Sequence, residues 1–272
     1  MKRWIIIALI ALTMVGLFVA NQVELLAIGP AAASSAAPTE KMTMANQLYE
    51  AGQYAQAAQA YQQLVDQGIA DGSLYYNLGN AHFKQGDYGR AILNYRRAQQ
   101  LLPRDPDIKA NLALARAQTV DQFEVVQDDG ALSGLGNALR SRFTLNELAM
   151  AALAAWILFV FLLILFGSAK RDSTWRRGLK SALVASAVVL VVGVVALGSA
   201  LYVTDGQSEG VVVAAEVDVT SGPGAQYVTE FALHSGTEVE LVEVRGNWAR
   251  LALPGGELEG WVPANTVEPV RG

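Results

Sequence analysis

The sequence predicts a multidomain membrane protein that combines all-α helical repeats, a transmembrane helical hairpin and a small all-β barrel. Three observations predict this architecture. Residues 41–118 repeat themselves at a spacing of 34, two uncharged apolar runs occupy Leu148–Phe166 and Leu183–Val203, and residues 210–270 form short alternating runs separated by glycine-rich turns. A fixed period of this length is typical of a solenoid, and runs of this length are typical of membrane spans.

The N-terminal segment, residues 1–28, has a basic start followed by the uncharged run Trp4–Ala20. This pattern fits a signal sequence, and the run is also close to the minimum length of a membrane span. Small residues at 31–33 satisfy a cleavage pattern but lie far from the apolar run. The segment is therefore either a removed signal sequence or a retained N-terminal membrane anchor, and in both cases the residues after it are exported. Residues 29–40, rich in Ala, Ser and Pro, are expected to be a linker.

The repeat region, residues 41–118, is predicted to consist of helical hairpins that bury their apolar faces on one another. Several residues return 34 positions later with the same identity. Among them are Asn46 and Asn80, Gly52 and Gly86, Tyr54 and Tyr88, Ala57 and Ala91, Tyr61 and Tyr95, and Asn77 and Asn111. Residues 107–118 add a single amphipathic helix that is expected to cap the stack.

The second unit reads Tyr75-x-x-Leu78-Gly79-x-x-His82, then Ala91-x-x-x-Tyr95, then Pro103, and so resembles the tetratricopeptide repeat. Small residues at Gly79, Ala91 and Ala98 stand where two helices must pack closely. The resemblance implies a concave groove that binds an extended peptide or a partner helix. By the family arrangement Asn46, Tyr76, Asn80 and Lys84 would face that groove, and the alternative is that they are ordinary exposed polar residues. The third unit offers Asp107 and Asn111 rather than basic residues, which disfavours capture of a terminal carboxylate.

Residues 119–143 are expected to link the repeats to the membrane. Asp128-Asp129-Gly130 and Gly134-Leu135-Gly136 are typical of turns. Residues 132–143 also have the pattern of a short amphipathic helix that could lie on the membrane surface, with Arg140 and Arg142 near lipid head groups.

Two transmembrane helices are predicted at 144–167 and 182–204. Thr144 and Glu147 form a capping-box pattern at the start of the first helix, and Ser186, Gly193 and Ala200 form a small-residue stripe along the second. The alternative is a pair of buried helices in a soluble domain. The intervening loop, residues 168–181, carries five basic residues and one acid and is predicted to be cytoplasmic. The repeats and the C-terminal module would then both lie on the outer face.

The C-terminal module, residues 210–270, is expected to form about five short strands in a small barrel. It resembles the bacterial SH3-like domain through Val217–Pro223, Gly236–Val239, Asn247-Trp248 and Gly260–Pro263. Many relatives bind cell-wall peptides, so Tyr227, Trp248 and Trp261 could line a ligand groove; the alternative is that the tryptophans complete the core. Thr220 stands where family members usually carry an arginine, so any ligand contact by that arginine is lost.

Composition excludes several classes of function. The chain has no cysteine, two histidines and a formal net charge of −5. Cysteine nucleophiles and thiolate metal sites are therefore absent, and a nucleic-acid binder would need a basic face. Neither histidine has metal-ligand spacing, and no phosphate loop, G-x-S-x-G elbow or dinucleotide fingerprint occurs. The sequence predicts a protein without enzymatic activity, cofactor, metal or nucleic-acid partner.

The order of the modules resembles the BatE type of protein from aerotolerance operons. That resemblance implies a membrane-anchored scaffold for protein–protein interactions on the outer face of a bacterial cytoplasmic membrane, in stress tolerance or envelope complex assembly. It also implies von Willebrand A-type membrane proteins and a MoxR-type ATPase system as partners. The alternative is a cell-wall sensor or anchor whose SH3-like domain binds peptidoglycan.

Overall fold

The computed structural model describes residues 36–121, 131–169, 174–206, 208–254 and 258–271. The predicted signal sequence or anchor and most of the predicted linker lie outside these residues. The chain forms two compact units. One contains α7 with the long apolar helices, and the other contains the repeat helices with the C-terminal sheet.

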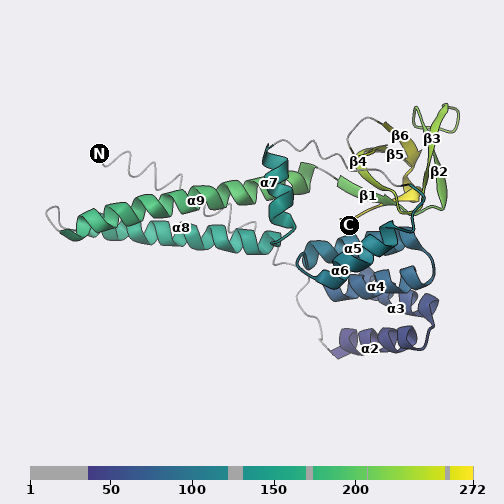
Figure 1. The fold of residues 1–272 in the computed structure, drawn as a ribbon, viewed down its shortest axis with the longest axis horizontal. Helices are drawn as coiled ribbons and strands as arrows, with labels where there is room; N and C mark the ends of the chain where they lie inside the picture. The colour runs from purple at the N-terminus through teal and green to yellow at the C-terminus, as the bar shows by residue number, and fades with distance from the viewer. Residues whose placement is uncertain (1–35, 122–130, 170–173, 207, 255–257, 272) are drawn as a thin grey trace. The chain divides into compact units, whose positions relative to one another are not determined.

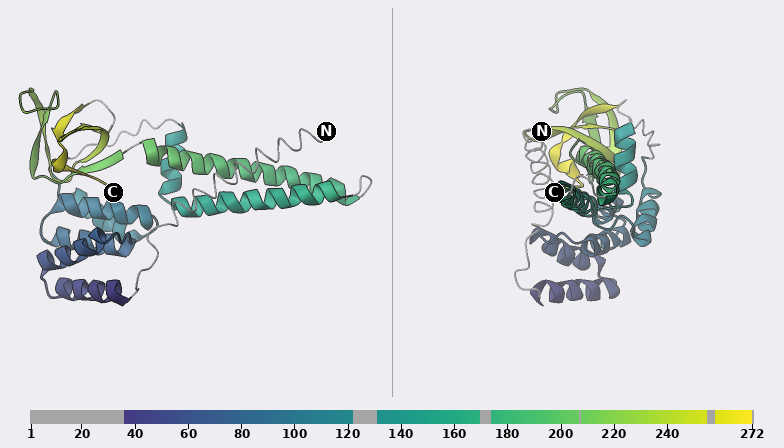
Figure 2. Two further views of the ribbon diagram at one scale, coloured as in Figure 1. Left: turned by 180° about the vertical axis from the view of Figure 1, so that it is seen from behind. Right: turned by 90° about the vertical axis from the view of Figure 1, so that its left-hand side faces the viewer.

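The repeat region consists of helices joined by short turns and stacked in chain order (Figures 1 and 2). The helices are α2 (Ala36–Glu50), α3 (Tyr54–Asp66), α4 (Gly72–Lys84), α5 (Tyr88–Leu101) and α6 (Pro106–Arg116). The first helix begins at Ala36, within the segment predicted as a linker. Gly52 and Gly86, which are 34 residues apart, end the turns α2–α3 and α4–α5 with φ of 76° and 78°. These left-handed conformations explain why the period preserves glycine at both positions.

Small residues allow the repeat helices to pack closely, as the sequence predicted. Ala91 and Ala98 are fully buried. A Cβ at Gly79 would lie 2.7 Å from the ring of Tyr95, so α4 and α5 meet at a point that only glycine fits. Asp71, Asp87 and Asp105 cap the starts of α4, α5 and α6 with their carboxylates.

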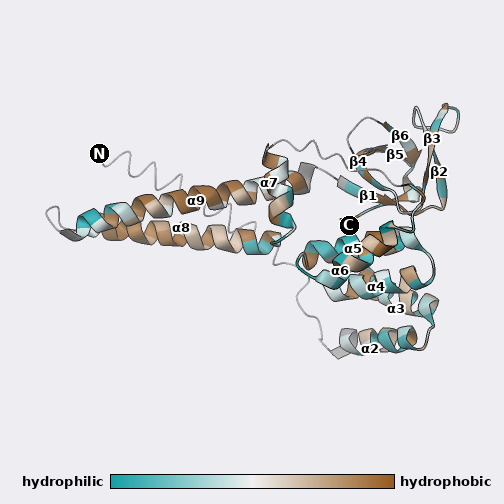
Figure 3. Cartoon of the chain, viewed as in Figure 1, coloured by the Kyte–Doolittle hydropathy of each residue, from teal (hydrophilic) through white to brown (hydrophobic). Residues whose placement is uncertain are grey.

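The other unit contains α7 (Ala131–Arg140), α8 (Leu145–Ser168) and α9 (Thr174–Gly206). The predicted capping box is present, because Glu147 N donates to Thr144 Oγ1 at 3.2 Å and Thr144 N donates to a Glu147 carboxylate oxygen at 2.9 Å. Leu145–Ser168 and Trp175–Val203 are long and apolar enough to cross a membrane, by length and composition (Figure 3). Gly193 approaches Ala152 on α8, while Ser186 and Ala200 are buried.

The basic segment differs in part from its prediction as a loop. Helix α9 begins at Thr174, so Arg176, Arg177 and Lys180 are helical rather than in the connection. No proline lies between Thr174 and the apolar run, so nothing there interrupts the helix. The guanidinium and ammonium groups of the segment can extend away from the helix. The helical hydrogen-bond pattern therefore continues beyond the apolar run in which the span was predicted.

The C-terminal module is an antiparallel sheet with the order β3-β2-β6-β5-β4-β1-β7. Its strands are β1 (Ser208–Val212), β2 (Glu216–Thr220), β3 (Thr229–His234), β4 (Glu238–Arg245), β5 (Trp248–Ala252), β6 (Glu259–Pro263) and β7 (Val267–Pro269), and the short helix η1 (Ala264–Thr266) precedes β7. Among the described residues β3 does not pair with β7, so the predicted barrel is not closed. Leu233 of β3 and Val267 of β7 nevertheless share one core, so the sheet is bent around it.

The repeats and the sheet also share an apolar core within their unit. Ile92 and Leu112 from α5 and α6 pack in one cluster with Val211 of β1 and Val270 near the C-terminus. These side chains are almost completely buried. The sheet therefore covers the end of the repeat stack, where a further repeat would otherwise be needed to bury the same residues.

Candidate partner-binding groove

The first helices of the successive repeat units, α2, α4 and α6, carry a series of hydrogen-bonded polar side chains, and we call this surface the candidate groove. A cavity of about 240 Å³ lies at its N-terminal end, among side chains of α2, α3 and α4. The cavity is lined by Asn46, Tyr49, Glu50, Tyr61, Asn77 and Asn80. Four of these six side chains are amides or phenols that lie at repeated positions of the 34-residue period, namely Asn46, Asn80, Tyr61 and Asn77.

The repeated residues form the same hydrogen-bonded group twice. In the first group, Tyr61 donates its hydroxyl to Asn46 Oδ1 at 2.6 Å, and Asn77 Nδ2 donates to the same oxygen at 3.3 Å. In the second, Tyr95 donates to Asn80 Oδ1 at 2.7 Å and Asn111 Nδ2 donates to it at 2.9 Å. The period therefore preserves a polar network as well as a packing surface.

Burial keeps the tyrosines of this network neutral. It raises the pKa of Tyr61 to about 12 and also raises the pKa of Tyr95. Each phenol thus remains a hydrogen-bond donor across the physiological pH range. Glu50 is the one charged residue among those that line the cavity, so this end of the groove disfavours an anionic group.

The network leaves amide donors that have no hydrogen-bond acceptor among the described residues. The carbonyl oxygens of Asn46 and Asn80 each accept two hydrogen bonds. Within the described part of the chain, neither Asn46 Nδ2 nor Asn80 Nδ2 donates to another group. Each amide is held in one orientation by its carbonyl, and its NH₂ group is available to an acceptor such as a peptide carbonyl.

The four residues predicted from the sequence fall into different places. Asn46 and Asn80 line the cavity. Tyr76 does not line it, but its hydroxyl accepts a hydrogen bond from Asn111 Nδ2 at 3.0 Å in the second group. Lys84 is exposed near the end of α4 and also lies outside the cavity lining. Whether these residues bind a partner remains a proposal.

Other lining residues were not predicted as site residues, namely Tyr49, Glu50, Tyr61 and Asn77. For Tyr61 and Asn77 the signal was present in the sequence, because both recur 34 residues later as Tyr95 and Asn111. No such repetition marks Tyr49 or Glu50. Both lie one helical turn after Asn46 on α2, which places them on the same side of the helix as Asn46.

The three aromatic residues predicted on the sheet differ in exposure. Trp261 is only 7% exposed, and the Arg245 guanidinium lies 5.1 Å from its ring centroid. Trp248 is half-buried on β5 and pairs with Arg245 on β4. Tyr227 is 44% exposed. Of the three, Tyr227 presents the most surface to a ligand, and Trp261 presents very little.

Thr220 has a structural role at the position where an arginine was expected from the family pattern. Its hydroxyl is buried and lies 2.9 Å from Gly222 O and 3.1 Å from Trp261 O. Thr220 and Trp261 are also the residues at which β2 and β6 pair. The hydroxyl therefore joins two strands and the following turn, and an arginine would not fit this enclosed position.

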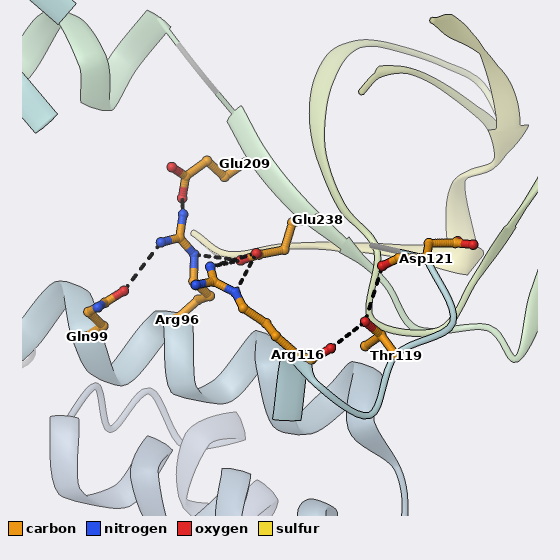
Figure 4. A network of polar contacts seen from close by, with 7 residues as sticks. All are labelled: Arg96, Gln99, Arg116, Thr119, Asp121, Glu209 and Glu238. Carbon is orange, nitrogen blue, oxygen red and sulfur yellow. Dashed lines mark hydrogen bonds and ion pairs between the residues drawn. The ribbon is translucent and has the colours of Figure 1, made fainter. Parts of the chain in front are cut away.

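A network of charges joins the repeats to the sheet and was not predicted (Figure 4). Arg96 on α5 contacts Glu209 of β1 at 2.6 Å and Glu238 of β4 at 3.0 Å. Arg116, at the end of α6, donates two hydrogen bonds of 2.9 Å to Glu238. Burial alone would lower the pKa of Arg96, but the two carboxylates outweigh it and raise the pKa, so Arg96 stays charged.

Two further contacts complete this interface. Arg97 Nη2 donates to Pro269 O at 2.8 Å. Asp121 accepts hydrogen bonds from the backbone N of His234 at 2.7 Å and from Thr237 Oγ1 at 2.6 Å, and His234 Nδ1 lies 2.9 Å from its other oxygen. Burial would raise the pKa of Asp121, but these hydrogen bonds lower it. The sequence does carry a signal for this interface, because the C-terminal module from residue 210 onward has nine acidic residues and three arginines, an excess that complements the arginines of α5 and α6.

Among the described residues, no cluster of three or more histidine or acidic side chains has the arrangement of a metal site. Apart from the Glu50 carboxylate, the polar side chains that line the cavity are amides and phenols, which donate and accept hydrogen bonds. The chemistry that this groove offers is recognition by hydrogen bonding.

Residues 42–106 match the family model described as Tetratricopeptide repeat. These residues are tetratricopeptide repeats. The match covers about a quarter of the chain and agrees with the stacked helices α2 to α5. No curated protein matches the chain. The repeats are an interaction fold without catalytic function, and they support a role in protein–protein interaction.

Proposed function

We propose that this protein is a membrane-anchored scaffold that binds an extended segment of a partner protein in the groove of its repeats. The observation that carries the proposal is the pair of oriented amides at Asn46 and Asn80. The two amides are separated by one repeat, and each is held through its carbonyl oxygen, which accepts hydrogen bonds from a tyrosine and an asparagine. An extended peptide offers carbonyl oxygens at regular spacing and would accept from both.

The binding test uses a substitution that keeps the network and removes the donors. In Asn46→Asp combined with Asn80→Asp, a carboxylate oxygen still accepts from Tyr61 and Tyr95, but no amide proton remains for the partner. We expect the apparent affinity for the partner to fall by about tenfold or more, because two hydrogen bonds are lost and a peptide carbonyl faces a carboxylate. The measurement is pull-down of the partner from detergent-solubilised native membranes across a range of bait concentrations.

The matched control is Lys84→Ala, which lies outside the cavity lining on the same helix as Asn80. A photo-crosslinker at Tyr49 should trap the partner, whereas one at the exposed Gln63 on α3 should not. If the double aspartate variant captures the partner as well as the native chain does, or if Tyr49 yields only crosslinks between copies of this chain, the groove is not the binding site.

The proposed location is the bacterial cytoplasmic membrane, with the repeats and the SH3-like module on the outer face. Support comes from the two apolar helices and from the basic residues between the apolar runs. Exposed aromatic residues stand near both ends of α9, Trp175 at 78% and Tyr202 at 65% exposure. The two residues are about 40 Å apart along a helix, which matches a bilayer with its interfaces, where Trp and Tyr are enriched.

The sidedness is testable because the chain contains no cysteine. Single cysteines at Gln118 and Asn265 should react with a membrane-impermeant maleimide added to intact spheroplasts. A cysteine at Lys180 should react only after the membrane is opened. Labelling of Lys180→Cys in intact spheroplasts would contradict the proposed orientation.

The BatE-type resemblance narrows the proposal to a scaffold in stress tolerance or envelope complex assembly. The partners it implies are von Willebrand A-type membrane proteins and a MoxR-type ATPase system. The pull-down described above tests this directly, because the captured proteins are identified by mass spectrometry. Recovery of unrelated proteins through the groove would retain the scaffold and reject the BatE-like role.

The second candidate function is a cell-wall sensor or anchor, favoured by the exposed ring of Tyr227 on a module that resembles the bacterial SH3-like domain. In this case the full chain in detergent should sediment with purified peptidoglycan, and Tyr227→Ala should reduce the retained fraction. Trp248→Phe serves as a comparison at a half-buried position of the same sheet. Retention no greater than that of a chain ending at Tyr202 would exclude this function.

A further inference from the structure

The short helix α7 carries an apolar stripe along one side. Leu132, Leu135, Gly136 and Leu139 recur at helical spacing, and Phe143 continues the stripe just beyond the helix. Leu132 is 58% exposed, and Leu135 and Phe143 are each 41% exposed. A helix of ten residues with this much exposed apolar surface needs a covering that the described residues do not supply.

Helix α7 approaches α9 closely at Gly136. A Cβ at Gly136 would lie 2.5 Å from Ser199 O and 2.7 Å from a Val203 methyl group. Gly136 is buried in this contact. Because backbone meets backbone here, α7 is held against α9 at one defined level (Figures 1 and 2).

That level coincides with the end of the apolar run in both long helices. On α9 the contact residues Ser199 and Val203 are the last turn of the uncharged run Leu183–Val203. On α8 the capping box at Thr144 begins the helix four residues before the uncharged run Leu148–Phe166, a rise of about 6 Å. Helix α7 thus lies where the hydrocarbon of a bilayer would give way to its polar interface.

The charges of this segment agree with that position. Residues 131–143 contain two basic residues, Arg140 and Arg142, and no acid. Both follow the apolar stripe at the end that leads into α8. A basic amphipathic segment of this kind suits a phospholipid surface, in which the apolar side chains enter the acyl boundary and the guanidinium groups meet phosphates.

We propose that α7 is an interfacial helix that binds the phospholipid surface through Leu132, Leu135, Leu139 and Phe143 and fixes the depth of the α8–α9 hairpin. This inference rests on the proposed insertion of that hairpin in a membrane. The occupant of the apolar stripe is lipid, because the stripe continues the exposed apolar surface of α8 and α9 at the level of the interface. Gly136 sets the depth, since α7 cannot move along α9 without losing this contact.

The test uses three single-cysteine variants of the cysteine-free full chain, each labelled with an environment-sensitive fluorophore and reconstituted into phosphatidylcholine and phosphatidylglycerol nanodiscs. Leu135→Cys reports on the apolar stripe. Ser141→Cys is exposed and, at 100° per residue, lies on the opposite side, and its backbone N still donates to Asn137 O. Ile157→Cys, on the exposed surface of α8, reports on insertion of the hairpin.

Lipids brominated near the top of the acyl chain should quench the fluorophore at Leu135 several-fold more than at Ser141, and deeply brominated lipids should quench Ile157. Gly136→Val should reduce quenching at Leu135 while Ile157 is unchanged. If Ile157 is quenched and Leu135 is quenched no more than Ser141, the interfacial role of α7 is wrong and the membrane scaffold stands. Absence of quenching at Ile157 would reject membrane insertion itself.

Discussion

At the scale of single residues, glycines and aspartates decide where the elements of this protein can meet. Gly89, the second residue of α5, lies at the point where the helix contacts the sheet. A Cβ there would lie 2.3 Å from Ser235 Oγ and 2.8 Å from Val212 O. Gly236 faces Thr119 in the same region and has a φ of 96°. Both the lack of space for a Cβ and the left-handed backbone conformation therefore favour glycine at this position.

Gly89→Ala should therefore loosen the contact between the repeats and the sheet. We expect a loss of about 1–3 kcal/mol in the free energy of unfolding, since the backbone carbonyl of Val212 cannot turn away as a flexible side chain would. Urea unfolding of the full chain in detergent measures this loss. Gly178→Ala is the control, because a Cβ at Gly178 meets nothing within 4 Å. Equal stability of the two variants would show that the close approach at Gly89 does not matter.

Asp87 makes the stability of α5 dependent on acid pH. Burial would raise its pKa, but the His82 ring, whose Nδ1 lies 3.5 Å from a carboxylate oxygen, and two hydrogen bonds from Arg90 outweigh this effect and lower the pKa from 3.8 to about 2. The unfolded chain thus takes up a proton at higher pH than the folded chain does. The stabilisation is fully present above the unfolded value and is lost as the pH falls from about 4 to 2.

Asp87→Asn should isolate this contribution, because asparagine retains the N-cap acceptor without the charge. At neutral pH we expect the variant to be less stable by about 1–2 kcal/mol, a value reduced for partial exposure of the carboxylate. The difference should shrink toward zero near pH 2. The measurement is urea unfolding of both chains between pH 6 and pH 2. A difference that stays constant with pH would refute the assignment.

At the scale of elements, three arginines of α5 and α6 connect the repeats to the edge of the sheet. Arg96 and Arg116 share Glu238, and Arg96 also binds Glu209 (Figure 4). The Arg96 guanidinium is held between two strands and stays protonated. A half-exposed ion pair contributes little, but a shared and partly buried network leaves a costly unpaired charge when one member is removed.

Arg96→Met should cost about 3 kcal/mol or more, because Glu209 loses its arginine partner and Glu238 keeps only Arg116. Combining it with Glu238→Gln should recover part of this loss, since one of the two carboxylates is neutralised. A double-mutant cycle with thermal unfolding measures the coupling energy between the two positions. Strict additivity would mean that the network seen between α5 and β4 does not contribute to stability.

At the scale of the whole molecule, the sheet acts as the last layer of the repeat stack within their unit. One apolar cluster combines Ile92 and Leu112 of the repeats with Val211 of β1 and Val270 near the C-terminus. A repeat stack exposes an apolar face at its end unless something covers it. The cover here comes from Val211 and Val270, which follow the two long apolar helices in the chain.

Truncation of the chain after Tyr202 should therefore weaken the repeats themselves. We expect amides of α5 and α6 to lose most of their protection in hydrogen exchange, because their apolar cover is removed, while α3 retains more. Hydrogen exchange with mass spectrometry of the full and truncated chains in nanodiscs gives the comparison. Unchanged protection in α5 and α6 would show that the repeats fold independently of the sheet.

The sequence predicted the elements that depend on local patterns. The 34-residue period located the repeat helices, and Gly79 and Ala91 stand at close contacts between helices as predicted. The capping box at Thr144 formed as predicted. The start of α9 was less predictable, because arginine and lysine are compatible with both a loop and a helix.

The candidate groove could be predicted in part. Asn46 and Asn80 were recognisable from the repeat, but the arrangement that orients their amides depends on Tyr61, Asn77, Tyr95 and Asn111. The aromatic groove predicted on the sheet was less certain from sequence, since the same tryptophan pattern serves a core or a surface. The burial of Trp261 follows from its pairing position on β6.

By itself the sequence determined the modular order of this protein: amphipathic repeats, two apolar helices with a basic segment between them, and a strand-rich module. These properties are periodic or compositional, so they appear within short windows of the chain. Only the tertiary structure decided that the sheet stays open between β3 and β7, that Arg96 lies between Glu209 and Glu238, and that Gly136 fits against Ser199. Such contacts join residues distant in sequence, and their energy depends on geometry that no local pattern encodes.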